Sequence, residues 1–277
     1  MRLPYSVIEK LNNLTNCEMT LYLWLCERQN NRGVVYGVRM ADLKNHMSKQ
    51  SFYNALNGLQ SKQLIYTLYH KSEHDYDIGL FMKHDHEECK QGYINLNNQI
   101  FQSDDFKKLN SREKYLMLSL YAKTSVNISS SGTKAIHRKN KNEFYKKYTT
   151  ILNRSKRRIR EYLHDLRKFF NINIHKEMYY IGRNRNTYSL DKKEDKNGKL
   201  KHRIHNVKAM TKRYGIKGAT DKFIEDVVKL YKNYIKMFDE FKLDRAIAKA
   251  IEAHSKDNNR TASAARVHQY LRKELAL

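Results

Sequence analysis

The sequence predicts a mainly α-helical fold with small β-hairpins, arranged as two similar units followed by a helical C-terminal region. Three observations lead to this fold class. Two helical segments recur along the chain, a hairpin-like segment follows each recurrence, and the last third has apolar residues at helical spacing. The 277 residues include one proline and ten glycines, which argues against a β-sandwich or a proline-rich linker protein.

The first recurring segment is 14–25, which aligns with 109–120 at a constant offset of 95. Each copy opens with Thr15 or Asn110, three residues before a shared glutamate. This is the capping-box pattern that starts a helix, so both segments are predicted to be helical. The identical pairs are Leu14/Leu109, Glu18/Glu113, Leu21/Leu116, Leu23/Leu118 and Leu25/Leu120.

The second recurring segment is 48–59, which aligns with 155–166 at an offset of 107. The twelve additional residues of the second copy fit a Ser-rich and then basic loop at 124–141. Ser48 and Ser155 are natural N-caps. Each copy has an apolar stripe at helical spacing, formed by Phe52, Leu56 and Leu59 in the first and by Ile159, Leu163 and Leu166 in the second.

Strand-like sequence follows each of these helices. In the first copy, 64–69 and 76–81 flank a polar turn at 71–75. In the second copy, 179–181 and 187–190 flank the turn Gly182–Asn186. The order helix, short helix, capped helix and hairpin thus occurs twice, which predicts two winged helix-turn-helix domains in tandem. A generic α+β protein with two capped amphipathic helices is the alternative.

The last third predicts three helices. Their apolar positions are Phe223, Val227, Tyr231, Tyr234 and Phe238, then Ala246, Ile247, Ala250 and Ile251, then Ala264, Val267, Leu271 and Leu275. The segment before them lacks an apolar period and is predicted to be a linker. The expected domains are a first winged helix over 1–103, a second over 104–191, a basic linker over 192–218 and a helical domain over 219–277.

The charge is large and uneven. The chain has 54 Lys and Arg against 29 Asp and Glu, a net charge of +25. Residues 1–104 are neutral, 105–195 carry a net +14 and 196–277 a net +11. A folded, aromatic-containing protein with this excess indicates a nucleic-acid partner, with a merely soluble basic protein as the alternative. No apolar run approaches the roughly 18 residues of a membrane span. The three cysteines form no CxxC motif. Together with the missing membrane span and the expected nucleic-acid partner, this predicts a cytoplasmic, nucleoid-associated protein.

The second copy carries the residues best suited to hold double-stranded DNA. Its recognition helix would lie in the major groove, where arginine pairs with guanine, and its wing tip would lie on a phosphate or in the minor groove. The candidates are Lys156, Arg157, Arg160, His164 and Arg167 on the helix, with Arg183 and Arg185 at the wing tip. The alternative is that these residues form a solvent-exposed basic face without a binding role.

The first copy presents Lys49, Gln50, Ser51, Tyr53, Asn54 and Asn57 on its helix. Asn and Gln can pair with adenine but bring little attraction to phosphates. Its wing tip at 71–75 is acidic and is expected to be repelled by DNA. This copy is therefore expected to add base contacts, or to form a homodimer through an aromatic surface that includes Trp24, Tyr66 and Tyr69.

The segment Tyr93-Ile94-Asn95-Leu96, with Phe101 and the run Phe106 to Leu118, resembles the entry to the winged-helix domain of plasmid replication initiators from Gram-positive bacteria. In that family an extended segment precedes a helix rich in Lys, Leu and Tyr. A weaker first and stronger second DNA-binding copy is also similar to iteron-binding initiators. The resemblance covers 90–190 and implies binding at a replication origin.

Other motifs are weaker. His84-Asp85-His86-Glu87-Glu88-Cys89 holds potential zinc ligands without a second ligand pair, and its His-x-His lacks the apolar middle residue of rolling-circle nickases. His164 to Arg167 matches the His-x-x-Arg of tyrosine recombinases, but its leucine belongs to the apolar stripe. No P-loop motif occurs. We therefore expect no metal, cofactor or catalytic residue.

These patterns lead to a non-catalytic, sequence-specific double-stranded DNA-binding protein, with transcription regulation as the expected role. The first alternative is a plasmid- or phage-type replication initiator that binds origin repeats. The C-terminal helices would then be the surface for a protein partner. A DNA-nicking enzyme is the weaker alternative.

Overall fold

The computed structural model describes residues 2–30, 32–72, 74–81, 93–124, 136–184, 186–187, 200–257 and 261–277. This part of the chain is mainly helical and carries small antiparallel sheets, which confirms the coarse fold class. None of its helices is long and apolar enough to span a membrane. The chain divides into two compact units: unit 1 comprises 1–20 and 86–198, and unit 2 comprises 21–85 and 199–277.

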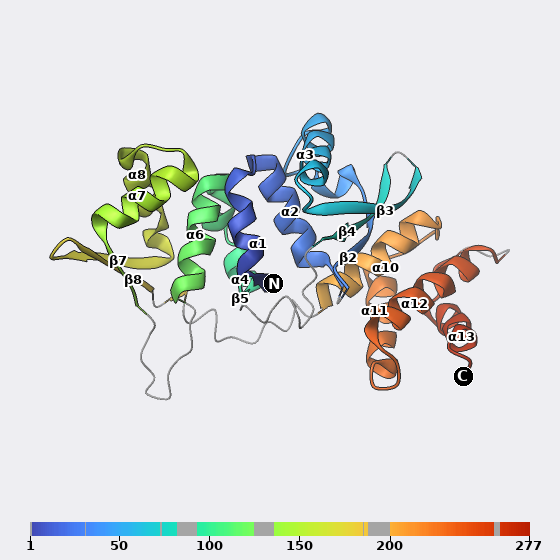
Figure 1. Ribbon diagram of the computed structural model, residues 1–277. Helices are drawn as coiled ribbons and strands as arrows, with labels where there is room; N and C mark the ends of the chain where they lie inside the picture. Colours follow the sequence, from blue (N-terminus) through green and yellow to red (C-terminus); the bar gives the residue numbers. More distant parts are fainter. Residues whose placement is uncertain are drawn as a thin grey trace. The chain divides into compact units, whose positions relative to one another are not determined.

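Unit 1 brings the N-terminal residues onto the later segment of the chain (Figure 1). Its elements are β1 (Arg2–Pro4), α1 (Tyr5–Lys10), η1 (Leu11–Asn13), the start of α2 (Asn16–Arg28), β5 (Tyr93–Asn95), α4 (Asn98–Phe101), α5 (Asp104–Lys108), α6 (Ser111–Thr124), β6 (His137–Asn140), α7 (Lys141–Leu152), α8 (Lys156–Asp165), η4 (Leu166–Lys168), β7 (Phe170–His175) and β8 (Met178–Arg183).

Two contacts account for this grouping, which differs from the four consecutive domains expected from the sequence. β1 pairs antiparallel with β5, with Leu3 opposite Ile94, and both residues are fully buried. α1 packs against α6 through its buried residues Val7 and Ile8. The first twenty residues therefore complete the core of unit 1.

The sheet of unit 1 has the strand order β6-β8-β7, and all its pairings are antiparallel. Above it, the ring of Phe144 on α7 contacts those of Tyr148 and Tyr179, with centroids 4.6 and 5.0 Å away. The hydroxyls of Tyr145 and Tyr179 are 2.5 Å apart. Aromatic side chains therefore fix α7 to β8 at the centre of this unit.

The second hairpin differs from the prediction. Its strands are β7 and β8, and its turn is Lys176-Glu177, not Gly182–Asn186. Both turn residues have left-handed backbones, with φ of 46° and 57°. A two-residue hairpin turn of this kind usually contains Asn-Gly, so the sequence lacks the usual signal. Of the predicted strand at 187–190, only Thr187 is described, and it is helical.

Unit 2 combines the rest of the first copy with the C-terminal helices (Figure 1). Its elements are α2 from Leu21 onward, β2 (Val34–Val38), η2 (Met40–Leu43), α3 (Lys49–Ser61), β3 (Ile65–Ser72), β4 (Asp75–Leu80), α10 (Lys201–Arg213), α11 (Asp221–Tyr234), α12 (Glu240–Ser255) and α13 (Ala264–Glu274).

The two three-stranded sheets share one topology. The order β2-β4-β3 repeats as β6-β8-β7, each with a helix between the first strand and the hairpin. Both predicted capping boxes form: the carboxylates of Glu18 and Glu113 accept from the backbone N–H of Thr15 and Asn110 over 2.7 and 2.8 Å. The repeat predicted from the sequence is thus present in the order and capping of the elements.

The predicted linker 192–218 contains a helix, α10, which packs on β2. A Cβ added to Gly37 would lie 2.5 Å from the Cβ of Ala209, so only glycine allows this approach. The sequence of α10 shows no apolar period, because some of its buried positions hold polar side chains that form hydrogen bonds in the interior. Asn206 is 4% exposed and donates to Tyr231 over 3.0 Å and to Asp244 over 3.2 Å.

The three predicted C-terminal helices are confirmed as α11, α12 and α13. Thr220 caps α11 by accepting from the backbone N–H of Phe223 over 3.2 Å. The helices share a core with α10, whose fully buried members include Val207, Val227, Tyr231, Leu243, Ile247, Ala250, Ile251, Val267 and Leu271. Asp244 in this core also accepts from Asn30 over 3.0 Å, which ties the C-terminal helices to the first copy within unit 2.

Candidate nucleic-acid interface

Helix α8 is the central element of the candidate interface, and the predicted boundaries hold. Ser155 caps it by accepting from the backbone N–H of Arg158 over 3.4 Å. Ile159 and Leu163 are 0% and 5% exposed, so the predicted apolar stripe faces the core of unit 1. The opposite side of the helix is therefore left to polar side chains.

All five helix positions predicted for DNA contact are exposed: Lys156, Arg157, Arg160 and His164 on α8, and Arg167 on η4. Arg158 is an additional exposed cation that the sequence reasoning missed; 59% of its side chain is exposed. Its position one turn from the cap would have suggested it, because the apolar stripe leaves that position outside the core.

Glu161 lies among these cations and binds two of them. Its Oε1 accepts from Nε of Arg157 over 3.1 Å, and its Oε2 accepts from Nη1 of Arg158 over 2.6 Å. These hydrogen bonds, with that of Arg157 the stronger, lower the pKa of Glu161 below its ordinary value. The carboxylate therefore stays ionised and holds both guanidinium groups beside α8.

Arg160 has a different neighbour. Its guanidinium carbon lies 5.9 Å from the ring centroid of Tyr145 on α7, within the range of a cation–π contact. An aromatic ring restrains a guanidinium without neutralising its charge. Arg160 thus keeps a full charge for an external anion.

The two arginines predicted for the wing tip are not found there in the described structure. Arg183 is at the end of β8, away from the hairpin turn, because the turn lies at 176–177. Its guanidinium carbon is 3.7 Å from the ring centroid of Tyr121, and its Nη2 donates to the carbonyl of Tyr121 over 3.3 Å. The wing-tip role is therefore wrong for Arg183. Arg185 lies outside the described residues.

Helix α3 presents the candidates of the first copy. Lys49, Gln50, Asn54 and Asn57 are exposed, whereas Ser51 and Tyr53 are half-buried. Nε2 of Gln50 donates to Oδ1 of Asn54 over 2.9 Å, and the hydroxyl of Tyr53 lies 2.7 Å from Nδ1 of His74 in the first hairpin. The amide side chains of Gln50, Asn54 and Asn57 thus lie at the surface of α3 beside Lys49, with those of Gln50 and Asn54 hydrogen-bonded to each other.

The two described aspartates of the first hairpin are buried, whereas the sequence suggested an exposed acidic turn. Asp75 and Asp77 are 3% and 8% exposed. Arg213 on α10 donates to both carboxylates, over 2.8 Å to Asp75 and 2.6 Å to Asp77, and Arg39 donates to Asp75 over 3.1 Å. Glu73, the other acid of this turn, lies outside the described residues.

The pKa of Asp75 reflects this pairing. Burial alone would raise it, but the hydrogen bonds and charges of Arg213 and Arg39 outweigh burial and lower the pKa below its ordinary value. The repulsion expected between this turn and DNA is therefore not supported at Asp75. Arg213 was missed because the sequence assigned its segment to a linker.

The proposed aromatic surface of the first copy loses one member. Trp24 is 6% exposed, with the ring of His205 on α10 at 5.4 Å and the guanidinium of Arg28 at 4.1 Å. It is unavailable to a second copy because α10 covers it. Tyr66 is half-buried, and the side chain of Tyr69 lies outside the described part, as do His84 to Cys89.

A scan against protein-family models and searches of curated proteins and of solved structures found no match to this chain.

Proposed function

We propose that this protein binds double-stranded DNA without catalysing a reaction, through two winged helix-turn-helix units in tandem. The observation that carries the proposal is α8, a capped amphipathic helix whose outer side holds five basic side chains and which a β-hairpin follows. Strand order, helix caps and a hairpin occur in α2 to β4 and again in α6 to β8. This repetition supports the proposal of two winged helix-turn-helix units in tandem.

In this proposal α8 supplies most of the phosphate attraction. Residues 105–195 carry a net charge of +14, and Arg160 and Lys156 are exposed without a carboxylate partner in the part of the chain that the structure describes. Arginine on a helix in the major groove can pair with guanine and also neutralise phosphates. Affinity would then fall steeply with salt concentration.

Helix α3 would act mainly on sequence preference. Its exposed Gln50 and Asn54 have the amide groups that pair with adenine, and Lys49 is the single cation among its predicted contact residues. Loss of an amide contact changes discrimination between bases and leaves the number of neutralised phosphates unchanged.

The first test is selection of bound duplexes from a random pool, followed by fluorescence anisotropy with the selected duplex. Arg160→Ala should weaken binding by about 1–3 kcal/mol, or roughly fivefold to 150-fold. Arg272→Ala, an exposed arginine on α13, is the matched control and should bind as the wild type does. Equal affinity of the wild type and Arg160→Ala would overturn the assignment of α8.

We propose transcription regulation as the biological role, with replication initiation as the second candidate. The exposed apolar side chains after α11, Met237 at 61% and Ile235 at 36%, favour the second because they offer contact area for a protein partner. Mapping of bound DNA in cells distinguishes the two. Sites at many promoters support regulation, and clustered repeats at one locus support initiation.

A nicking activity would contradict the non-catalytic part of the proposal. The test is incubation of supercoiled DNA with the protein and a divalent metal ion. The proposal predicts that the DNA stays supercoiled, and conversion to the open-circular form would overturn it.

A further inference from the structure

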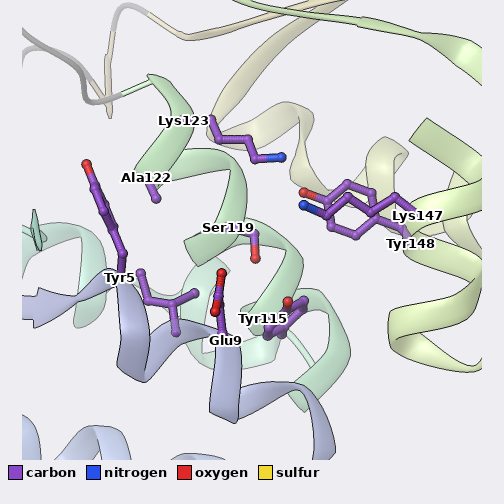
Figure 2. A pocket seen from close by; sticks show the side chains of 9 residues that line it. Tyr5, Glu9, Tyr115, Ser119, Ala122, Lys123, Lys147 and Tyr148 are labelled. Atoms are coloured by element: carbon purple, nitrogen blue, oxygen red, sulfur yellow. The ribbon is translucent and has the colours of Figure 1, made fainter. Parts of the chain in front are cut away.

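Unit 1 contains a cavity that the proposed DNA contacts do not use. It has a volume of about 320 Å³ and lies between α1, α6 and α7 (Figure 2). This volume falls at the lower end of the range for small-molecule sites. All three helices line it, with Glu9 from α1, Lys123 from α6, and Lys147 and Tyr148 from α7 among its charged and polar members.

Two lysines meet at one end of this cavity. The Nζ atoms of Lys123 and Lys147 lie 5.7 and 5.9 Å from the ring centroid of Tyr148. Neither amine has an ion-pair partner within the described residues. Lys139 on β6 is also near, but it is paired with Glu143. Two like charges in one cavity repel each other unless an anion lies between them.

The hydroxyl of Tyr148 is a second and independent sign of a ligand. Tyr148 is 1% exposed, and its hydroxyl has no hydrogen-bond partner among the residues that the structure describes. A buried hydroxyl without a partner loses the hydrogen bonds that it makes with water in the unfolded chain, so an isolated core tyrosine is a poor explanation. Figure 2 shows this hydroxyl and the amine of Lys123 pointing toward one another across the cavity.

The neighbouring amines also affect the titration of Lys123. Burial, followed by the neighbouring amines of Lys147 and Lys139, lowers its pKa to about 8. Burial and the same three lysines lower the pKa of His137 on β6 to about 4. A bound anion would favour the charged form of Lys123. Binding near pH 8 would therefore be accompanied by uptake of a proton by the Lys123 amine.

The rest of the lining limits the ligand. Tyr5, Ile8, Tyr115 and Ala122 provide aromatic and apolar surface, and Glu9 provides the carboxylate of this lining. A second anionic group on the ligand would be repelled by Glu9. The ligand therefore has one anionic end and an apolar or aromatic body.

We propose that this cavity binds a small phosphate monoester, with its phosphate between Lys123 and Lys147 and with the hydroxyl of Tyr148 donating to a phosphate oxygen. Two lysines suit a phosphate dianion better than a single carboxylate. A phosphate of duplex DNA is excluded as the occupant, because the hydroxyl of Tyr148 is buried while the duplex backbone stays at the surface. Occupancy would connect α6 to α7, the helix that precedes α8.

The test is isothermal titration of the full-length protein with phenyl phosphate, with sodium chloride at equal ionic strength as the blank. Saturable binding is expected, weakened at least tenfold by Lys147→Gln and by Tyr148→Phe, which keeps the ring. Lys146→Gln is the matched control, because Lys146 is an exposed lysine on the same helix. Circular dichroism checks that each variant is folded. Lys147 is exposed, so Lys147→Gln is expected to leave the fold intact.

A second readout uses protons. At pH 8, the apparent enthalpy should differ between buffers of different ionisation heat, and this difference should vanish in Lys123→Gln. Heats no larger than those of sodium chloride would overturn the proposal, as would equal weakening by Lys146→Gln. The proposal also fails under a second pattern of results. In that pattern the wild type does not bind phenyl phosphate, and Lys147→Gln and Tyr148→Phe weaken duplex binding as much as Arg160→Ala does.

Discussion

Nη2 of Arg213 donates to Oδ1 of Asp75 over 2.8 Å, with 6% of the arginine side chain and 4% of the aspartate side chain exposed. The same nitrogen donates to Asp77 over 2.6 Å. This pairing joins α10, from the segment expected to be a linker, to the first hairpin of unit 2. It makes the carboxylates of Asp75 and Asp77 part of the interior.

Removal of Arg213 should therefore destabilise unit 2. In Arg213→Ala, Asp75 keeps Arg39 and Asp77 keeps the backbone N–H of Gly37 over 2.8 Å, but both buried carboxylates lose their shared arginine. Loss of one member of a buried ion pair costs about 3–5 kcal/mol. Trp24, the one tryptophan of the sequence, lies in this unit, so its fluorescence during urea unfolding reports on it. Arg272→Ala should be neutral, and an Arg213→Ala midpoint equal to that of the wild type would contradict the pairing.

The contact between Gly37 and Ala209 gives a second test of α10 on β2. Gly37→Ala should cost about 2–4 kcal/mol, because φ is +60° and the new methyl group would clash with Ala209. Ala209→Gly alone should cost about 1 kcal/mol from helix propensity. In the double variant the clash is relieved, so its loss should be smaller than the sum of the two. Strict additivity in urea unfolding followed by Trp24 fluorescence would show that the two residues do not touch.

Glu240 predicts a pH dependence for unit 2. Burial opposes its ionisation, but the hydrogen bonds and charges of His202 and Arg203 outweigh burial and lower its pKa to about 2. The folded pKa is below the ordinary 4.5, so this stability is complete above pH 4.5 and is lost as the pH falls toward 2.

From pH 5 to pH 3, this residue should remove about 2 kcal/mol of stability. Glu240→Gln keeps the shape of the side chain and should show a correspondingly smaller decline in the free energy of unfolding. The measurement is the urea midpoint of Trp24 fluorescence at both pH values. Equal declines in the two proteins would exclude Glu240 as the source.

Glu161 should lower DNA affinity because its carboxylate neutralises Arg157 and repels phosphates. Glu161→Gln is expected to tighten duplex binding about threefold to fivefold at low salt, because one surface negative charge is removed. The gain should shrink as salt is added. Fluorescence anisotropy measures both effects. Weaker binding by Glu161→Gln would show that its hold on Arg157 and Arg158 matters more than its charge.

The elements that the sequence predicts well are those with a local physical signal. The pairs Thr15 with Glu18 and Asn110 with Glu113 start helices through contacts three residues apart, so a short pattern is sufficient. The apolar stripe of α8 likewise predicts which side chains are exposed. These signals need no knowledge of the tertiary structure.

The elements that the sequence does not predict depend on distant partners. Asn206 and Arg213 look like solvent-facing residues, but in the fold they donate hydrogen bonds to Asp244, Tyr231 and Asp75. The turn at Lys176-Glu177 has no glycine, and the cavity lysines Lys123 and Lys147 come from separate helices. Without these tertiary contacts, α10, the second hairpin and the cavity cannot be inferred.

The most direct test of the central claim compares α8 with α3 by the salt dependence of duplex binding. The slope of log affinity against log salt concentration should become smaller by about one for Arg160→Ala, because one phosphate contact is lost. Asn54→Ala on α3 should leave the slope unchanged and alter the preferred bases. An unchanged slope for Arg160→Ala would contradict the claim that α8 is the main phosphate-binding element of this protein.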